Sequence, residues 1–356
     1  MKVSIKEVAA RAGVSTGTVS NVFNGKTTVK PALAERVRRV AQDLGYEPNR
    51  VAAQLRGRPA RVVAALVPDL NNPFFTNLLA SLERSARESG FDLIVASSNS
   101  DPAEEKARLS ALLAWHPAGV IVVPCSDEFR CRTLLEQRGV PFVIADRCPP
   151  DYRGDAVTID NVDAGRLAAD HLVQLGHRNI LVVASSLRIL NIRERCEGIR
   201  QVFAAHGLEP PRIVEIGHDF DKSSEILSRA IPGDPRPTAL LALTAFATLG
   251  ILAALQRRGL NVPSDMSVLG FDDYSWMQAV NPPLTSILQP VEAMGRESWA
   301  RLRSRIQGST EPPVRIQLQC TRMERASTSS MRNAAKGSLP EDCIGKQRGN
   351  AARRPA

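Results

Sequence analysis

The stretch SIKEVAARAGVSTGTVSNVFNG at residues 4–25 decides the fold of the N-terminal part of this chain. Ser4 and Glu7 have the spacing of a capping box, in which each side chain accepts from the other residue's backbone N–H, so a helix is expected to begin there. Gly13 is expected to end this helix, because a sharp turn between two helices needs a residue that tolerates a positive φ. A second helix is therefore expected directly afterwards.

This second helix is expected over residues 16–24, with Ser15 as its N-cap. Val19, Val22 and Phe23 recur at the spacing of one helix face and are expected to point inward. The opposite face is small or polar and carries Thr16, Gly17, Thr18, Ser20 and Asn21. Two helices joined by a glycine turn are typical of a helix-turn-helix, whose second helix lies in the DNA major groove.

A third helix is expected to begin near Pro31 and to end at Gly45. Its outer face is basic, with Arg36, Arg38 and Arg39. Beyond it, Asn49 can cap a helix of about two turns, which Gly57 and Pro59 stop. Because a helix this short is marginal alone in water, it is expected to order only against a partner.

Charge is unevenly distributed along the 356 residues, whose net charge is +9. Residues 1–61 hold twelve basic and four acidic side chains, and residues 327–356 hold six and two. A basic end on a near-neutral body is what binding to a phosphate backbone requires. The six cysteines and five histidines are scattered without metal-ligand spacing. No zinc, no cofactor and a cytoplasmic location without membrane span or signal peptide are expected.

From residue 62 onward, apolar strands alternate with amphipathic helices. Strands are expected at 62–67, 93–96, 119–123, 141–145, 179–184, 213–216, 238–242, 266–270, 284–289 and 314–319. Helices are expected at 74–89, 103–115, 164–175, 193–206, 245–259 and 291–307. This alternation predicts parallel sheets with helices on both faces, and the number of strands favours two Rossmann-like lobes over one.

Together these segments resemble the LacI-type family of bacterial transcriptional regulators. The resemblance covers about residues 3–326. Besides the opening stretch, it rests on the words LGYEPN, VAAQLR, VPDLNNPFF, LGHRNI, RCEGIR, GLNVPSDMSVLGFDD and NPPLTSILQP. It implies an all-α helix-turn-helix headpiece with a hinge helix, followed by an α/β two-lobe body like that of periplasmic binding proteins.

The resemblance also implies a division of the chain into four parts. The headpiece would be residues 1–48, the hinge helix and linker 49–61, the body 62–326 and a disordered basic tail 327–356. Within the body, one lobe would comprise 62–160 and 290–318, and the other 161–289 and 319–326. Some family members carry a leucine heptad in the tail that makes tetramers. This tail lacks one, so a homodimer is expected.

The implied partner is a near-palindromic double-stranded DNA operator. Thr16, Gly17 and Asn21 would face base edges. Since Gly17 has no reading side chain, recognition should depend on the other two residues. The side chains suited to phosphate contacts are Ser4, Ser15, Thr18, Ser20 and Asn24. Leu55 of the hinge helix would insert into the minor groove as a wedge.

The second implied partner is a small effector in the cleft between the lobes, which would change the lobe angle and thereby the spacing of the hinges. The family's effector residues carry over to Phe75, Asn191, Arg195 and Asp272, and Trp276 is a further candidate cover. Three of these residues have structural alternatives. In these alternatives, Phe75 is an ordinary residue of the hydrophobic core, Arg195 forms a structural ion pair, and Asp272 caps the turn that follows it.

One departure from the family bears on the effector's chemistry. Where the family usually has Asn-Asp before LG, this chain has Thr244-Ala245, so a carboxylate is missing and the hydroxyl of Thr244 takes the place of the amide as a candidate effector contact. Arg188, Arg193 and Arg195 lie close together in the sequence and favour an anionic ligand, such as a sugar acid or sugar phosphate. A degenerate site without any ligand is the alternative.

Two other classes of protein fit the sequence less well. An enzyme with a Rossmann-like body would need a phosphate-binding loop such as GxGxxG after its first strand, but PDLNNP stands there. Asp272 and Asp273 would be its paired carboxylates. A transporter's solute-binding protein would share the body but would need a signal peptide and have no use for a headpiece.

Overall fold

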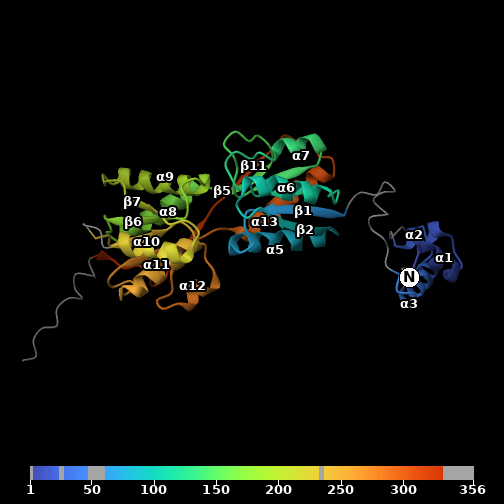
Figure 1. The fold of residues 1–356 in the computed structure, drawn as a ribbon, viewed down its shortest axis with the longest axis horizontal. Coiled ribbons are helices and arrows are strands. Elements are labelled where there is room, and N and C mark those ends of the chain that lie inside the picture. Colours follow the sequence, from blue (N-terminus) through green and yellow to red (C-terminus); the bar gives the residue numbers. More distant parts are fainter. Residues whose placement is uncertain (1–2, 24–27, 47–60, 232–235, 332–356) are drawn as a thin grey trace, which may run out of the picture. The chain divides into compact units, whose positions relative to one another are not determined.

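The computed structural model describes residues 3–23, 28–46, 61–231 and 236–331 (Figure 1). The chain divides into two compact units, residues 1–60 and 61–356. Asn24, Leu55, the expected hinge helix before Arg61 and the tail beyond Met331 lie outside the described residues, so the expectations for them remain predictions.

Three helices form the N-terminal unit: α1 (Ile5–Ala12), α2 (Thr16–Phe23) and α3 (Pro31–Asp43). The expected capping box is present at the start of α1, where the Ser4 backbone N–H donates to the Glu7 carboxylate over 2.6 Å. Gly13 ends α1 with φ +64°, a value that glycine adopts without a steric penalty. The local sequence therefore sets both the start of α1 and its turn into α2.

The core of this unit is aliphatic. Val8, Val19 and Val37 are almost completely buried, one from each helix. Phe23 was expected to point inward and does not, because it lies at the end of α2 and is 36% exposed. Its ring packs on Tyr46 at a centroid distance of 5.8 Å instead. With Phe23 displaced, valine and alanine side chains make up the buried core between the three helices, and Ile5, Leu44 and Tyr46 pack against it.

The body contains two six-stranded sheets, and the expected α/β fold class is confirmed. The first sheet is entirely parallel in the order β11-β5-β4-β3-β1-β2. Its strands are β1 (Val62–Val67), β2 (Asp92–Ser97), β3 (Val120–Val122), β4 (Phe142–Ala145), β5 (Ala156–Ile159) and β11 (Arg315–Leu318). β1 is a continuous apolar run, as is typical of a parallel strand covered on both faces.

The second sheet has the order β12-β10-β9-β8-β6-β7 and is parallel except at β12, which runs antiparallel to β10. Its strands are β6 (Ile180–Ala184), β7 (Arg212–Glu215), β8 (Ala239–Ala242), β9 (Ser267–Phe271), β10 (Thr285–Leu288) and β12 (Thr321–Met323). The body thus consists of two lobes, each built on one sheet. The lobe of the first sheet is called lobe 1 and that of the second sheet lobe 2.

Helices cover both sheets (Figure 1). Lobe 1 has α5 (Pro73–Glu88), α6 (Pro102–Leu113), α7 (Arg132–Arg138) and α13 (Val291–Ile306). Lobe 2 has α8 (Asn161–Gln174), α9 (Leu190–Ala205), α10 (Phe220–Ala230), α11 (Ala245–Arg257) and α12 (Ser275–Ala279). Five elements were not expected from the sequence: β5, β12, α7, α10 and α12. Four of them are short, since β5, β12, α7 and α12 have only three to seven residues. The exception is α10, whose eleven residues are amphipathic but were not recognised as a helix.

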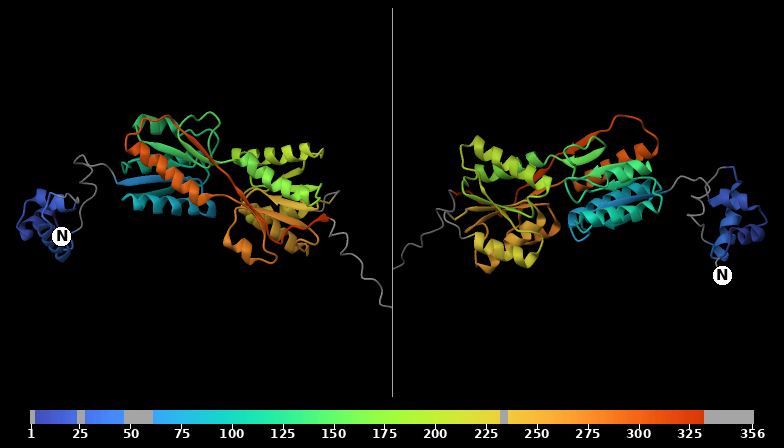
Figure 2. Two further views of the ribbon diagram at one scale, coloured as in Figure 1. Left: turned by 180° about the vertical axis from the view of Figure 1, so that it is seen from behind. Right: turned by 45° about the horizontal axis from the view of Figure 1, so that its top comes forward.

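The chain passes between the lobes three times (Figure 2). It crosses from β5 to α8, from β10 back to α13, and from β11 to β12. These crossings are made by residues 160, 289–290 and 319–320. Each lobe therefore combines an early part of the chain with a part from near the C-terminus.

Residues 327–331 form a segment that we call the C-terminal strap, and they correct the expectation that the disordered tail begins at 327. Ser327 is fully buried, and its hydroxyl donates to the carbonyl of Val268 over 2.6 Å. The strap's backbone also meets His177, whose Nε2 lies 3.1 Å from the Ser329 carbonyl. The sequence does not reveal that residues 327–331 bind to the body, because the small polar residues among them contribute hydrogen bonds and little apolar area.

Candidate functional site

The start of α2 provides the first candidate site. The Ser15 hydroxyl accepts from the Thr18 backbone N–H over 3.1 Å and also contacts the Thr18 hydroxyl at 3.0 Å. Thr16 and Gly17 are exposed, while Ser20 and Asn21 are half-buried. This capped helix start presents small residues and backbone N–H groups, which is the surface that a helix entering the major groove needs.

Three of the expected phosphate-binding hydroxyls already serve the fold. Ser4 belongs to the capping box, where its N–H and hydroxyl hold Glu7 and lower the pKa of that carboxyl. Ser15 and Thr18 bond each other at the start of α2. Exposed arginines on α3 add positive charge, at positions Arg36, Arg38 and Arg39.

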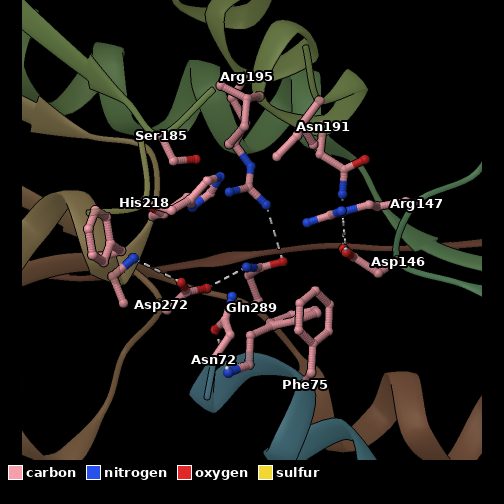
Figure 3. Close-up of a pocket in the computed structure, with 16 residues that line it drawn as sticks. Asn72, Phe75, Asp146, Arg147, Ser185, Asn191, Arg195, His218, Asp272 and Gln289 are labelled. Atoms are coloured by element: carbon pink, nitrogen blue, oxygen red, sulfur yellow. Dashed lines mark hydrogen bonds and ion pairs between the residues drawn. The ribbon is translucent and has the colours of Figure 1, made fainter. Parts of the chain in front are cut away.

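The second candidate site is a hollow between the two lobes, with a cavity volume of about 80 Å³ (Figure 3). Lobe 1 contributes Asn72, Phe74, Phe75, Asp146 and Arg147. The other lining residues are Ser185, Ile189, Asn191, Ile192, Arg195, His218, Thr244, Ala245, Phe246, Asp272 and Gln289. Most of them follow the carboxyl ends of parallel strands, where α/β folds collect ligands.

Three hydrogen-bond acceptors and one aromatic ring of the protein contact the Arg195 side chain. Its Nε donates to Asn161 over 3.0 Å, and its guanidinium donates to the Leu243 carbonyl over 2.6 Å and to Gln289 over 3.4 Å. The guanidinium also lies 3.9 Å from the centroid of the Phe271 ring. Arg195 is thus anchored within lobe 2 and is not paired with a carboxylate in a direct ion pair.

A pair of glycines sets the position of Arg195. A Cβ at Gly165 of α8 would lie 2.1 Å from the Arg195 carbonyl oxygen, and a Cβ at Gly198 of α9 would lie 1.9 Å from the Val162 carbonyl oxygen. Only glycine permits this close approach of the two helices. Gly165 and Gly198 therefore help to position Arg195 in the hollow, although neither glycine lines it.

Asp272 follows β9 and has φ +64°. Its carboxylate accepts from the Ala245 backbone N–H over 3.1 Å and from the Gln289 amide. Burial raises the pKa of this carboxyl, while nearby Arg195 opposes the rise. Arg195 and Asp272 both belong to lobe 2 and are joined through Gln289 (Figure 3), so they do not face each other across the cleft.

Asn191 makes a direct contact between the lobes. Its amide nitrogen donates to Asp146 of lobe 1 over 2.9 Å, and both side chains are buried. Burial raises the pKa of Asp146 to about 6, although Arg147 and Arg195 oppose the rise. A carboxyl group that lines the hollow therefore joins the two lobes.

A second contact between the lobes lies at the start of α9. Ile189 stands at the N-cap position without a side-chain hydrogen bond, and Asp127 of lobe 1 accepts from the Leu190 N–H over 3.1 Å instead. The same carboxylate pairs with Arg193 at 2.5 Å. We call this contact the α9 latch. It caps the helix from the opposite lobe.

Five of the six expected effector residues line the hollow: Phe75, Asn191, Arg195, Thr244 and Asp272. Trp276 does not, because it is half-buried against Met277 and Leu284. Thr244 is the N-cap of α11 and accepts from the Ala247 N–H. That the five bind an effector remains a prediction.

The expected cluster of arginines does not converge. Arg188 and Arg193 do not line the hollow, and Arg193 is used in the α9 latch. The basic residues that do line it are Arg147, Arg195 and His218. Arg147 and His218 were not identified from the sequence as lining residues, because each lies in a loop after a strand and the loop contains no recognised sequence motif. Their place after β4 and β7 is the signal that could have found them.

Among the described residues, no group of His, Cys, Asp and Glu is arranged to hold a metal ion. The search for a long apolar helix, made over the same residues, found none that could cross a membrane.

Two family models match this chain, one in each of its two compact units. Residues 4–49 match the family model described as bacterial regulatory proteins, lacI family, and residues 169–328 match that of a periplasmic binding protein-like domain. The chain is 35% identical over 338 residues to the HTH-type transcriptional regulator CelR of Thermobifida fusca, with 91% of this chain and 98% of that protein covered.

Two solved structures resemble this chain over 92% of its length. A complex of CelR with cellobiose has a TM-score of 0.68 at 32% identity, covering 92% of this chain and 100% of that one. A lac repressor dimer bound to operator and the anti-inducer ONPF has a TM-score of 0.81 at 28% identity, with the same coverage.

Proposed function

This chain belongs to the LacI family of bacterial regulatory proteins. We propose that it is a repressor, and that its affinity for its operator changes when a small sugar-like molecule binds in the hollow between its lobes. As a member of this family it is a DNA-binding transcriptional regulator. The observation that carries the proposal is the presence, on one chain, of a capped helix-turn-helix and a two-lobe body with a polar hollow.

Two headpieces of a dimer place α2 in successive major grooves of a near-palindromic operator. Thr16 and Asn21 read base edges, while Gly17 permits close approach. Phosphate contacts come from the start of α2 and from Ser4, Ser20 and Asn24. In this proposal residues 1–48 are the headpiece, 49–61 pair as hinge helices in the minor groove, and Leu55 inserts there as a wedge.

The effector is a polyhydroxylated molecule held by Arg195, Asp272 and Asn191, with Phe75 against an apolar face. These polar side chains supply both donors and acceptors, which suits hydroxyl groups. A molecule that binds one lobe arrangement better than the other shifts the distance between the hinges. Such coupling between sites is typically about 1–3 kcal/mol.

The body also offers surfaces for a second copy of the chain. Its exposed large apolar residues include Leu70, Val95, Phe220, Ile226 and Leu249. Val95 lies on β2, an edge strand of its sheet. Exposed apolar groups next to a sheet edge favour association, and a homodimer matches the two-fold symmetry of a palindromic operator.

The proposal assigns no catalytic turnover to the body and places its action on bacterial DNA, in the cytoplasm. Support comes from the relatives, which are transcriptional regulators. Asp273, the second carboxylate of the expected pair, is bound by Arg325 at 2.6 Å and by the Ser286 hydroxyl at 2.6 Å. It is engaged within lobe 2 and does not line the hollow.

The test begins with selection of bound sequences from a random DNA pool, followed by a thermal-shift screen of sugars, sugar acids and sugar phosphates. We expect one near-palindromic operator and at least one compound that changes both the melting temperature and the operator affinity. A compound at about 100 times its Kd adds roughly 2.7 kcal/mol of stability. Absence of any enriched sequence, or of any compound acting on operator affinity, would contradict the proposal.

A further inference from the structure

We propose that the effector carries an acidic group, a carboxylate or a phosphate on a sugar framework, and that His218 of lobe 2 receives this group together with Arg147 of lobe 1. The inference rests on the proposed function of the hollow as the effector site. It adds the charge of the ligand and names His218 as the residue that makes the site specific for that charge.

The other charged groups of the hollow already bind protein partners. The Asp272 carboxylate accepts from Ala245 and Gln289, and that of Asp146 accepts from Asn191. All of the donating sides of Arg195 described above have acceptors within lobe 2. A ligand therefore meets charged groups that are already hydrogen-bonded to the protein, and such groups suit hydroxyls better than an added charge.

Arg147 is different, because its contacts are long. Its Nε lies 3.8 Å from Asp146, and its hydrogen bond to the Cys125 carbonyl is 3.4 Å. Its guanidinium lies over the Phe75 ring at 5.5 Å from the centroid and lines the hollow. Burial lowers the pKa of Arg147, which means that its positive charge is incompletely compensated by its surroundings. An anion in the hollow would compensate it.

His218 follows Gly217, which turns the chain after β7 with φ +71°. The imidazole packs on Phe246 at a centroid distance of 6.2 Å and points into the hollow (Figure 3). Among the described residues, neither of its ring nitrogens has a hydrogen-bond partner. The ring thus has an unused donor at the wall of the site, fixed in orientation by an aromatic neighbour.

Four charged groups surround this imidazole: Arg147, Asp69, Arg188 and Glu215. Burial lowers the pKa of His218 below its ordinary 6.5, and Arg147 lowers it further. A bound anion favours the charged imidazole and reverses this effect. Because Arg147 and His218 come from opposite lobes, an anion between them would also draw the lobes together.

The experiment uses the full-length protein and isothermal titration calorimetry. The probes are glucose, galactose and ribose, each beside its aldonate and its phosphate ester, such as gluconate and glucose 6-phosphate. We expect an acidic member to bind at least about tenfold more tightly than its neutral counterpart, and its affinity to rise as the pH falls from 8 to 6. Comparison of carboxylate and phosphate shows which anion the site takes.

Variants separate the contribution of His218 from that of Asp146, whose protonation near pH 6 acts in the same direction. His218→Gln should lower the affinity for the acidic probe about tenfold, spare the neutral sugar and remove the histidine part of the pH dependence. Asp146→Asn should remove the part of the pH dependence that comes from protonation of Asp146. His206→Gln, at an exposed position on the C-terminal side of α9, is the matched control and should change neither.

The inference is overturned if a neutral sugar binds as tightly as its acid, or if His218→Gln leaves the preference for the acid intact. In both cases the proposed function stands, because a sugar still acts through the hollow. If no probe binds and no compound of the wider screen changes operator affinity, the proposed function fails together with the inference.

Discussion

At the scale of single residues, Arg195 illustrates how a candidate ligand residue is also part of the fold. Its removal would leave the Asn161 side chain, the Leu243 carbonyl and the Gln289 side chain without a donor in a buried region. Buried polar groups that lose their partners cost far more than the net gain of the bonds they made. Arg195 therefore joins α9, the end of β8 and the second crossing between the lobes.

We predict that Arg195→Ala lowers the free energy of unfolding by about 1–3 kcal/mol for each buried acceptor left without a donor, and that it abolishes the effector response. Arg200→Ala on the same helix is the control, because Arg200 makes only an exposed pair with Glu197 at 3.7 Å. That change should cost less than about 1 kcal/mol. Urea unfolding measures both values, and an equal loss in the two variants would show that Arg195 has no structural role.

Asn21 is the residue for which base reading is predicted, since an Asn amide can bond N6 and N7 of adenine together. Asn21→Ala should cost about 1–3 kcal/mol on the preferred operator and relax the preference at one position of each half-site. The matched comparison is Arg38→Ala on exposed α3, which should weaken binding to all sequences alike. Fluorescence anisotropy on a set of single-base operator variants measures the difference. A uniform loss for Asn21→Ala would make it a phosphate contact.

At the scale of elements, the α9 latch links a helix of one lobe to a loop of the other. The helix that carries Asn191 and Arg195 has no N-cap side chain of its own, and Asp127 supplies the missing acceptor only while the lobes are closed. The start of α9 is thus completed by closure. Opening of the lobes should expose the first turn of this helix before any other part of it.

We predict that Asp127→Ala increases hydrogen exchange at Leu190 about fivefold, because loss of a helix N-cap costs about 1 kcal/mol. Arg193→Ala removes the ion pair but leaves the cap, so it should change this exchange much less. Exchange measured by mass spectrometry on peptides from the start of α9 distinguishes the two. Unchanged rates in Asp127→Ala would mean that the latch is open in solution.

The C-terminal strap is a second element whose role can be tested by truncation. A stop after Ala326 removes the Ser327 hydroxyl, which serves both the Val268 carbonyl and the Thr285 N–H, and the Met331 N–H bond to Leu175. We expect a loss of about 2–4 kcal/mol in the free energy of unfolding. A stop after Met331 is the matched control and should cost less than about 0.5 kcal/mol. Equal stability of the two truncated chains would contradict the structural role of the strap.

At the scale of the whole molecule, the basic headpiece and tail predict how DNA binding depends on salt. Each phosphate contact changes the slope of log affinity against log salt by about 0.9. Arg36→Ala should therefore make the slope shallower by about 1, if that exposed arginine meets a phosphate. Arg257→Ala, at an exposed position of α11 in the body, should leave it unchanged. Anisotropy titrations at several salt concentrations measure both slopes, and equal slopes would contradict the assignment of α3 to DNA.

The sequence predicts most of this architecture because its regular parts are locally specified. The capping box at Ser4 and the continuous apolar run of β1 need no tertiary information. The short helices α7 and α12 escape prediction because tertiary packing, more than periodicity, selects them. The helix α10 is different, because its eleven residues are amphipathic and follow an Asp219 N-cap, and these local signals were overlooked. The strap escapes for a different reason, since Ser327 is buried through hydrogen bonds that composition does not reveal.

The candidate site, like the fold, is predicted from the sequence only in part. Motif words locate Asn191, Arg195 and Asp272, but they do not say that Gln289 connects the last two. That connection exists only because the chain returns between the lobes at this residue. Trp276 was misplaced because a large aromatic near a site can equally complete a small apolar cluster, as it does here.

The three passages between the lobes have a consequence for the order in which the protein can be made. Lobe 1 lacks α13 and β11 until residues 291–318 have been synthesised, and lobe 2 lacks β12 until residue 323. The N-terminal helices, by contrast, form a core of their own from the first 46 residues. A growing chain therefore displays a folded DNA-binding end long before it has a body. Interrupted translation would release fragments that touch DNA singly and respond to no effector.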